Sequence, residues 1–182
     1  MLRFMRLELS VYKKIIILSL IAFILLILPQ VIRFYFYDND NLVGDYYSLR
    51  VGESLLNNIY YDSVNERVFY PIGTGILLTL FSLIFKVNIE ISARILPILL
   101  GILSLILFYL ILKHFNYNSK LSYLTSLALI ISPGFLFLFS TLNNFTFPIF
   151  ISLLALYFYL KNLIWISFIL ILFNNLFSIL SV

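Results

Sequence analysis

The sequence predicts an all-α protein, a polytopic transmembrane bundle of about five spanning helices with juxtamembrane amphipathic helices in a long first outer loop. Hydrophobic residues make up 63% of its 182 residues and charged residues 11%, whereas a soluble domain has roughly half apolar and about a quarter charged residues. Six of the eight acidic residues lie within residues 38–66, and the chain after residue 69 is almost continuously apolar. Residues 1–182 are therefore predicted to form one transmembrane module.

The composition also argues against several kinds of site. The chain has no cysteine, so neither a disulfide framework nor a thiolate metal site can form. His114 is the only histidine, which argues against zinc sites and histidine-based catalytic triads. The net charge of +4 comes from basic residues beside apolar runs, and we expect no nucleic-acid partner because a basic, soluble surface is lacking.

The first span is predicted at residues 15–37, directly after a basic N-terminal segment. That segment carries Arg3, Arg6, Lys13 and Lys14. Cytoplasmic loops carry an excess of Lys and Arg, so the N-terminus is predicted to be cytoplasmic. The loop at residues 38–92, which holds most of the acids, is therefore predicted to be extracytoplasmic.

Residues 70–85 form the next apolar stretch and leave two topologies open. The stretch has about 16 residues, and a spanning helix needs ~20. If it crosses the membrane, Lys113 and Lys120 lie outside. If it lies in the membrane interface, these lysines and Lys161 fall inside with the N-terminal cluster. The second arrangement obeys the positive-inside rule, and we expect a juxtamembrane helix here.

Four further spans are expected in the apolar second half of the chain. They cover residues 93–112, 121–139, 147–160 and 163–182. Within the acidic loop, residues 44–58 can form an amphipathic helix, because their apolar side chains recur at helical spacing. The chain stops at the end of a span, and we expect the module to be incomplete, with further C-terminal spans supplied by a longer chain or by a partner chain.

Three short motifs follow one another along the chain. They are residues 45–50 (DYYSLR), residues 70–73 (YPIG) and residues 93–97 (ARILP) followed by Gly101. In this order and spacing they resemble the GT-C superfamily of membrane glycosyltransferases, above all the oligosaccharyltransferase catalytic subunits and the lipid-linked mannosyl and aminoarabinosyl transferases. The resemblance covers nearly the whole chain. It implies an enzyme of the lipid bilayer that moves a sugar from a polyprenyl-phosphate donor to an acceptor on the extracytoplasmic face.

The resemblance also suggests roles for individual residues. Asp45 is the candidate base that takes the proton from the acceptor, and a carboxylate in a partly desolvated interfacial cleft suits that work. Arg50 and Arg94 are candidate clamps for the leaving phosphate, because a guanidinium binds phosphate oxygens bidentately. Further candidates for contacts with the substrate are Tyr46, Tyr47, Tyr70 and, more weakly, Lys86.

Two departures from the family pattern bear on the base and on metal binding. Counting back from Arg50, the position of the family's loop aspartate holds Gly44, and Asp45 stands one residue later. The acid pair of the family's second outer loop is replaced by Asn143 and Asn144. Asparagine is a weak, neutral oxygen ligand, so no strong Mg or Mn site is expected and a metal-independent transferase fits better. Weak metal candidates are Asp38, Asp40 and Asn143.

The candidates also have structural interpretations, and other functions stay open. Asp45 can stabilise the N-terminus of the predicted amphipathic helix. Arg50 can pair with Glu53 across a helical turn, and Arg94 can simply anchor a helix end at the interface. Asp38 and Asp40 can belong to a polar turn. A second functional hypothesis is a non-catalytic, truncated or degenerate relative that binds lipid or a partner subunit. A transporter or channel is disfavoured, because the later spans hold almost no ionisable residues to mark a substrate path.

Overall fold

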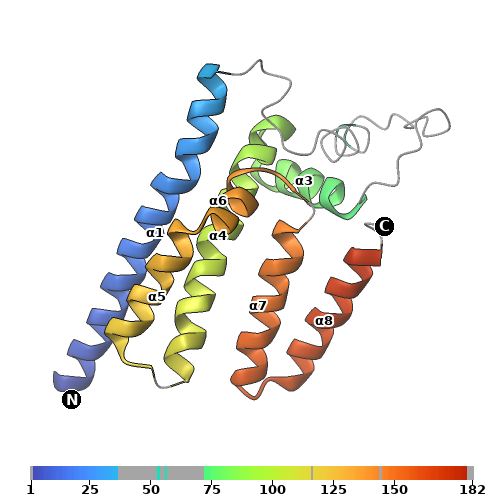
Figure 1. Cartoon of the computed structure of the whole chain (residues 1–182). Coiled ribbons are helices and arrows are strands. Elements are labelled where there is room, and N and C mark those ends of the chain that lie inside the picture. The colour runs from blue at the N-terminus through green and yellow to red at the C-terminus, as the bar shows by residue number, and fades with distance from the viewer. Residues whose placement is uncertain are drawn as a thin grey trace.

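The computed structural model describes residues 2–36, 53, 56, 72–115, 117–143 and 145–179. These ranges contain helices and no strand, which confirms the predicted all-α class. The helices are α1 (Leu2–Phe36), α3 (Ile72–Phe85), α4 (Ile89–His114), α5 (Ser119–Ile131), α6 (Pro133–Ser140), α7 (Thr146–Leu160) and α8 (Ile164–Ile179). Figure 1 shows α1, α4, α5, α7 and α8 side by side as a bundle, with α3 lying across its upper part.

Two helices are long and apolar enough to cross a membrane. They are the apolar part of α1, Val11–Val31, and the whole of α4. The helices α5 and α6 pass the same test only as a pair, and that pair is bent by 66°. The helices α7 and α8 have 15 and 16 residues, or about 22–24 Å against a hydrocarbon core of ~30 Å. By length and composition the described helices thus support two or three spans, fewer than the five expected.

The bend between α5 and α6 divides the span expected at residues 121–139. Pro133 has no N–H to continue the helical hydrogen bonds, and its ring disfavours helical geometry at Ser132. Ser132 is extended and caps α6: its Oγ accepts from the Phe135 N–H at 3.3 Å and donates to the Leu129 carbonyl at 2.7 Å. Helix α6 therefore leaves the direction of α5 and packs against α4.

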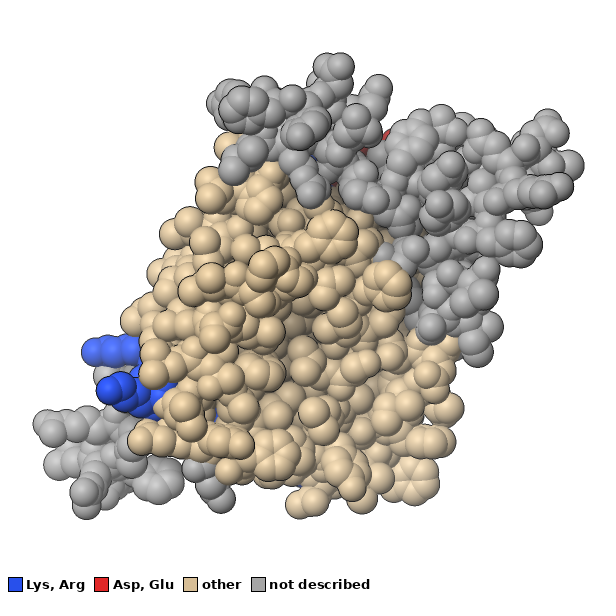
Figure 2. Space-filling model, in the orientation of Figure 1, with Lys and Arg blue, Asp and Glu red and all other residues tan. Residues whose placement is uncertain are grey.

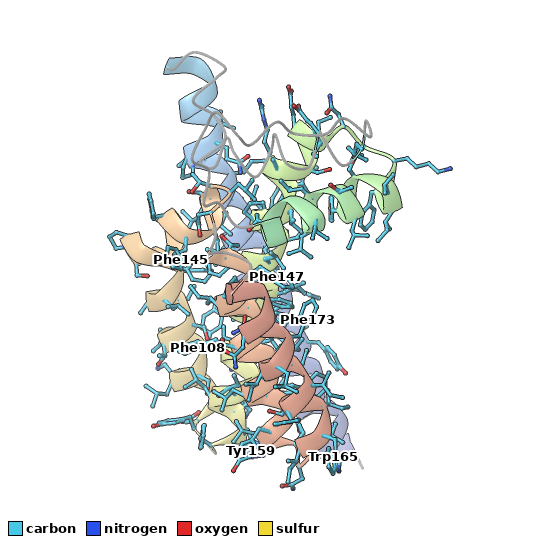
Figure 3. All side chains as sticks on the ribbon, turned by 90° about the vertical axis from the view of Figure 1, so that its right-hand side faces the viewer. Phe108, Phe145, Phe147, Tyr159, Trp165 and Phe173 are labelled. Atoms are coloured by element: carbon cyan, nitrogen blue, oxygen red, sulfur yellow. The ribbon has the colours of Figure 1, made fainter. Side chains whose placement is uncertain are left out.

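Helix α3 occupies the stretch for which an interfacial helix was expected. Its direction crosses that of the bundle in both Figure 1 and Figure 3. Leu78 holds it in place, because this fully buried side chain packs with Ile89 and Ala93 of α4 and with Leu142 after α6. The other side of α3 exposes the apolar residues Ile76, Leu80, Leu83, Ile84 and Phe85. Such an apolar side is what an interfacial helix turns toward lipid.

Only two residues of the amphipathic helix expected at residues 44–58 are described. Glu53 and Leu56 are both helical, and Leu56 packs against the small cluster formed around Leu78. The rest of that predicted helix lies outside the described residues.

The main core fills the space among α1, α4, α5 and α6. Its buried residues are Leu18, Ala22, Leu26, Ile98, Leu100, Leu105, Tyr109, Ile130, Phe135 and Phe139. Gly101 permits the close approach of three helices here: a Cβ atom at this position would lie 2.7 Å from the Phe139 Cβ and 2.8 Å from the Leu26 Cδ1. Small residues at such contacts are typical of helix packing in membranes, because they let backbones approach closely.

Cations bracket the apolar parts of α1 and α4. The two helices run in opposite directions (Figure 1). Lys14 and Arg33 on α1 are 19 residues apart, as are Arg94 and Lys113 on α4, and no charged residue lies between either pair. Nineteen helical residues span about 28 Å, close to the ~30 Å of a hydrocarbon core. Both helices therefore carry an uncharged segment of membrane thickness.

One end of the bundle is basic. It holds the start of α1, the α4–α5 turn and the α7–α8 turn (Figure 1), with Lys13, Lys14, Lys113, Lys120 and Lys161. The Nζ of Lys14 donates to the Ser119 Oγ at 2.6 Å and joins α1 to the start of α5. The blue side chains visible in Figure 2 lie at this lower end, and the visible flank above them is tan.

Candidate functional site

Three of the predicted site residues fall in the described part of the chain. They are Arg94, Lys86 and Asn143, and all belong to the end of the bundle opposite the basic end. The candidate base Asp45, the candidate clamp Arg50, the tyrosines Tyr46, Tyr47 and Tyr70, and the metal candidates Asp38 and Asp40 lie outside the described residues.

Arg94 lies in the second turn of α4, at the boundary of its uncharged segment. The side chain is partly buried, and its Nε is buried without a hydrogen-bond partner among the described residues. An N–H group shielded from water is costly when no acceptor pairs with it. Lys113 marks the other boundary, about 28 Å away along the helix. Arg94 thus stands at one end of the uncharged segment of α4, whose length matches the thickness of a hydrocarbon core.

Gln30 of α1 fixes the backbone beside Arg94. Its Nε2 donates to the Arg94 carbonyl at 2.9 Å and to the Ser140 carbonyl at 3.0 Å. The Ser140 carbonyl is one of the acceptors that the C-terminal end of α6 leaves without a helical partner. Gln30 was not among the predicted site residues, although an amide next to Pro29 inside an apolar span was an available signal. One side chain therefore joins α1, α4 and α6 at the level of Arg94.

The loop between α6 and α7 is held by its own hydrogen bonds. The Nδ2 of Asn143 donates to the Leu138 carbonyl at 2.7 Å, and its Oδ1 accepts from the N–H groups of Phe145 and Thr146 at 3.0 Å each. Thr146 adds a bond from its Oγ1 to the same Leu138 carbonyl at 2.8 Å. An amide oxygen has two acceptor sites, so both are used. Asn143 is a structural residue in this loop, and to bind a metal it would have to release these N–H groups.

The same loop lies against the start of α4. Leu142 is 3% exposed and packs with Ile89 and Ala93. Ala93 directly precedes Arg94 in the chain. The segment expected to be the second outer loop is therefore next to the residue expected to bind phosphate. Sequence spacing alone could not establish this neighbourhood.

Lys86 lies in the turn that joins α3 to α4. Its side chain is exposed and its backbone is left-handed, with φ of 53°, which ends α3. Ser82 closes this turn with its Oγ, which donates to the Val87 carbonyl at 2.6 Å. Asn88 then caps α4, since its Oδ1 accepts from the Glu90 N–H at 3.2 Å. Lys86 thus adds an exposed cation to the end of the bundle that holds Arg94.

The arrangement suits the binding of an anion at the membrane boundary. A guanidinium with an unpaired N–H offers a charge-assisted donor, and its planar fork matches phosphate oxygens. Among the described residues, no three His, Asp or Glu side chains form a cluster that could hold a metal ion. The chain matches no protein-family model, no curated protein and no solved structure.

Proposed function

We propose that this chain is a membrane glycosyltransferase module of the GT-C type, which takes a sugar from a polyprenyl-phosphate donor at the extracytoplasmic face. The observation that carries the proposal is Arg94, a partly buried cation with an unpaired Nε at the boundary of the apolar bundle. The phosphate of a polyprenyl donor lies at this depth, because its hydrocarbon chain lies in the bilayer. Gln30 supports the site by fixing the Arg94 backbone.

The proposed reaction uses residues of the first outer loop together with Arg94. Asp45 takes the proton from the acceptor, the acceptor atom forms a bond to the anomeric carbon, and the polyprenyl phosphate leaves with the electrons of the broken bond. Arg50 and Arg94 stabilise the negative charge on that phosphate. Tyr46, Tyr47, Tyr70 and Lys86 contribute to the donor and acceptor surfaces. The hydrogen bonds of Asn143 support a transferase without a metal at that position.

The proposed orientation places the basic end of the bundle in the cytoplasm, following the positive-inside rule. Helix α3 then lies in the outer interface, where its exposed Leu80, Leu83 and Ile84 provide an apolar wall for the polyprenyl chain. We further propose that the bent α5–α6 pair, α7 and α8 also lie in the bilayer, giving five passes. A bilayer can thin locally around helices as short as α7 and α8.

A non-catalytic relative that binds the lipid phosphate without transferring sugar is the second candidate. The structural role of Asn143, at the position where the family carries acids, favours it. In this case the chain presents the lipid to a partner subunit that supplies the chemistry.

Lipid binding tests the part of the proposal that both candidates share. The probe is a polyprenyl phosphate titrated into the purified protein in detergent, with wild type, Arg94→Ala and Lys113→Ala compared. Loss of a charged hydrogen-bond partner is worth about 1.5–3 kcal/mol, so Arg94→Ala should bind roughly 10- to 100-fold more weakly. Lys113→Ala, a matched cation at the opposite boundary of α4, should bind as wild type. Equal affinity of the two variants would mean that the phosphate does not bind at Arg94.

Sugar transfer separates the two candidates. Asp45→Asn should abolish transfer from a polyprenyl-phosphate sugar while lipid binding is kept, because only the base is removed. Full transfer activity in this variant would eliminate Asp45 as the base. Binding without any transfer by the wild type would favour the non-catalytic relative.

A further inference from the structure

Helix α8 lies at the edge of the bundle, with α7 as its main neighbour (Figure 1). Two polar residues face α7: Ser167 is 3% exposed, and the Nδ2 of Asn174 donates to the Ser152 Oγ at 3.1 Å. The Nδ2 of Asn174 is therefore used inside the protomer, whereas its Oδ1 is buried without a hydrogen-bond partner among the described residues. The adjacent Asn175 is exposed, and its side chain makes no hydrogen bond to another described residue.

An exposed stripe runs along α8 on the side of Asn175. It consists of Ile164, Phe168, Ile171 and Asn175, of which the first three are 60%, 53% and 47% exposed. The spacing of four, three and four residues is that of a heptad seam, the pattern by which two helices pack along their length. A single asparagine in such a seam fixes register and partner number in coiled coils.

The depth of Asn175 can be measured along the helix. Tyr159, Lys161 and Trp165 are exposed around the α7–α8 turn, and Figure 3 shows Tyr159 and Trp165 at the same end of the bundle. Aromatic residues beside a lysine are typical of a membrane boundary. Asn175 is ten residues further along α8, or about 15 Å, which is half of a ~30 Å hydrocarbon core. With α8 in the bilayer, as proposed above, its amide lies near the midplane, where lipid offers no hydrogen-bond partner.

We propose that this stripe is the interface with a second copy of the chain, in which the two α8 helices pack in parallel and Asn175 pairs with Asn175. Two copies inserted in the same bilayer have the same orientation, so a two-fold axis along the membrane normal places identical residues at identical depth. An amide carries both a donor and an acceptor, so two asparagines satisfy each other. A different partner helix would need its own polar group at this depth. The inference rests on α8 lying in the bilayer and is independent of the proposed enzymatic activity.

Disulfide cross-linking of the full chain in liposomes tests the interface. The chain has no cysteine, so one introduced cysteine is a clean reporter. Ile171→Cys places the thiol in the seam and keeps Asn175. Ile166→Cys is the matched control, because it is 42% exposed but lies on the opposite flank of the helix at 100° per residue. Oxidation should give a covalent dimer for Ile171→Cys and little for Ile166→Cys.

The contribution of Asn175 is tested in the reporter background. Ile171→Cys with Asn175→Leu should cross-link less, with the dimerisation constant reduced about three- to thirtyfold, the range measured for interhelical hydrogen bonds in membranes. Three results would overturn the inference: no dimer for Ile171→Cys, equal dimer for Ile166→Cys, or no effect of Asn175→Leu. The first would also point to a different protein, or to lipid alone, as the occupant of the stripe.

Discussion

The contact at Gly101 gives the sharpest prediction for stability. Gly101→Ala adds one carbon atom between α4 and its neighbours, 2.7 Å from the Phe139 Cβ and 2.8 Å from the Leu26 Cδ1. Carbon atoms attract best at about 3.5–4.0 Å, so the neighbours must retreat by roughly 1 Å. The Leu26 methyl group can rotate away, but the Phe139 Cβ is fixed to the backbone, so α6 must move relative to α4.

The magnitude follows from two opposing terms. Overpacking a well-filled core costs about 1–3 kcal/mol, and the upper part of that range applies because the Phe139 stem cannot rotate away. Replacing glycine by alanine inside a helix raises the free energy of unfolding by about 1 kcal/mol. We therefore expect Gly101→Ala to lower the free energy of unfolding by about 2 kcal/mol.

The assay is equilibrium unfolding in mixed micelles on increasing the SDS fraction, followed by circular dichroism. Gly134→Ala is the matched control, because Gly134 is helical and a Cβ atom there meets nothing within 4 Å. This variant should gain about 0.5–1 kcal/mol from helix propensity alone. If Gly101→Ala is stabilised as much as Gly134→Ala, α4 and α6 do not approach each other as described and the reasoning is wrong.

Two further substitutions test the end of the bundle that holds Arg94. Gln30→Leu removes both hydrogen bonds of the amide and leaves the Ser140 carbonyl without a partner among the described residues, so we expect a loss of about 1–3 kcal/mol in the same unfolding assay. Unchanged stability would mean that the amide does not join the three helices. Asn143→Asp replaces the donor that lies 2.7 Å from the Leu138 carbonyl by an acceptor, and the resulting repulsion should destabilise the chain by about 1–3 kcal/mol. Added Mg²⁺ or Mn²⁺ should not restore this loss, whereas recovery with either ion would indicate a metal site at this position.

The helix class and the approximate position of each described helix could be predicted because both follow from local composition. Long runs without charge have few alternatives to helix in a membrane. The details that were missed depend on backbone geometry. The span expected at residues 121–139 is two helices bent by 66°, because Pro133 and the Ser132 cap outweigh the continuous hydrophobicity. Five full spans were expected, and α7 and α8 are too short to qualify by length.

The candidate site stays a prediction, and the structure adds local detail to two of its residues. The sequence pointed to Arg94, and the structure adds that its Nε is buried and unpaired among the described residues. Asn143 was considered a weak metal ligand, and its hydrogen bonds within the loop give it a structural role instead. Gln30 was missed, because nothing in a linear sequence says which carbonyls lie within its reach. Asp45 and Arg50 stay predictions, since they lie outside the described residues.

The sequence by itself determined that this chain has helices apolar enough to cross a membrane, that two of them carry uncharged segments of bilayer thickness, and where its charges lie along the chain. These properties are additive over residues and need no knowledge of which helices touch. Only the tertiary structure decided that Gln30 joins three helices beside Arg94, that Gly101 sets the distance of α4 from α6, and that Asn175 faces outward while Asn174 faces α7. Such facts depend on the relative rotation of packed helices, which is decided by close packing among residues far apart in the chain.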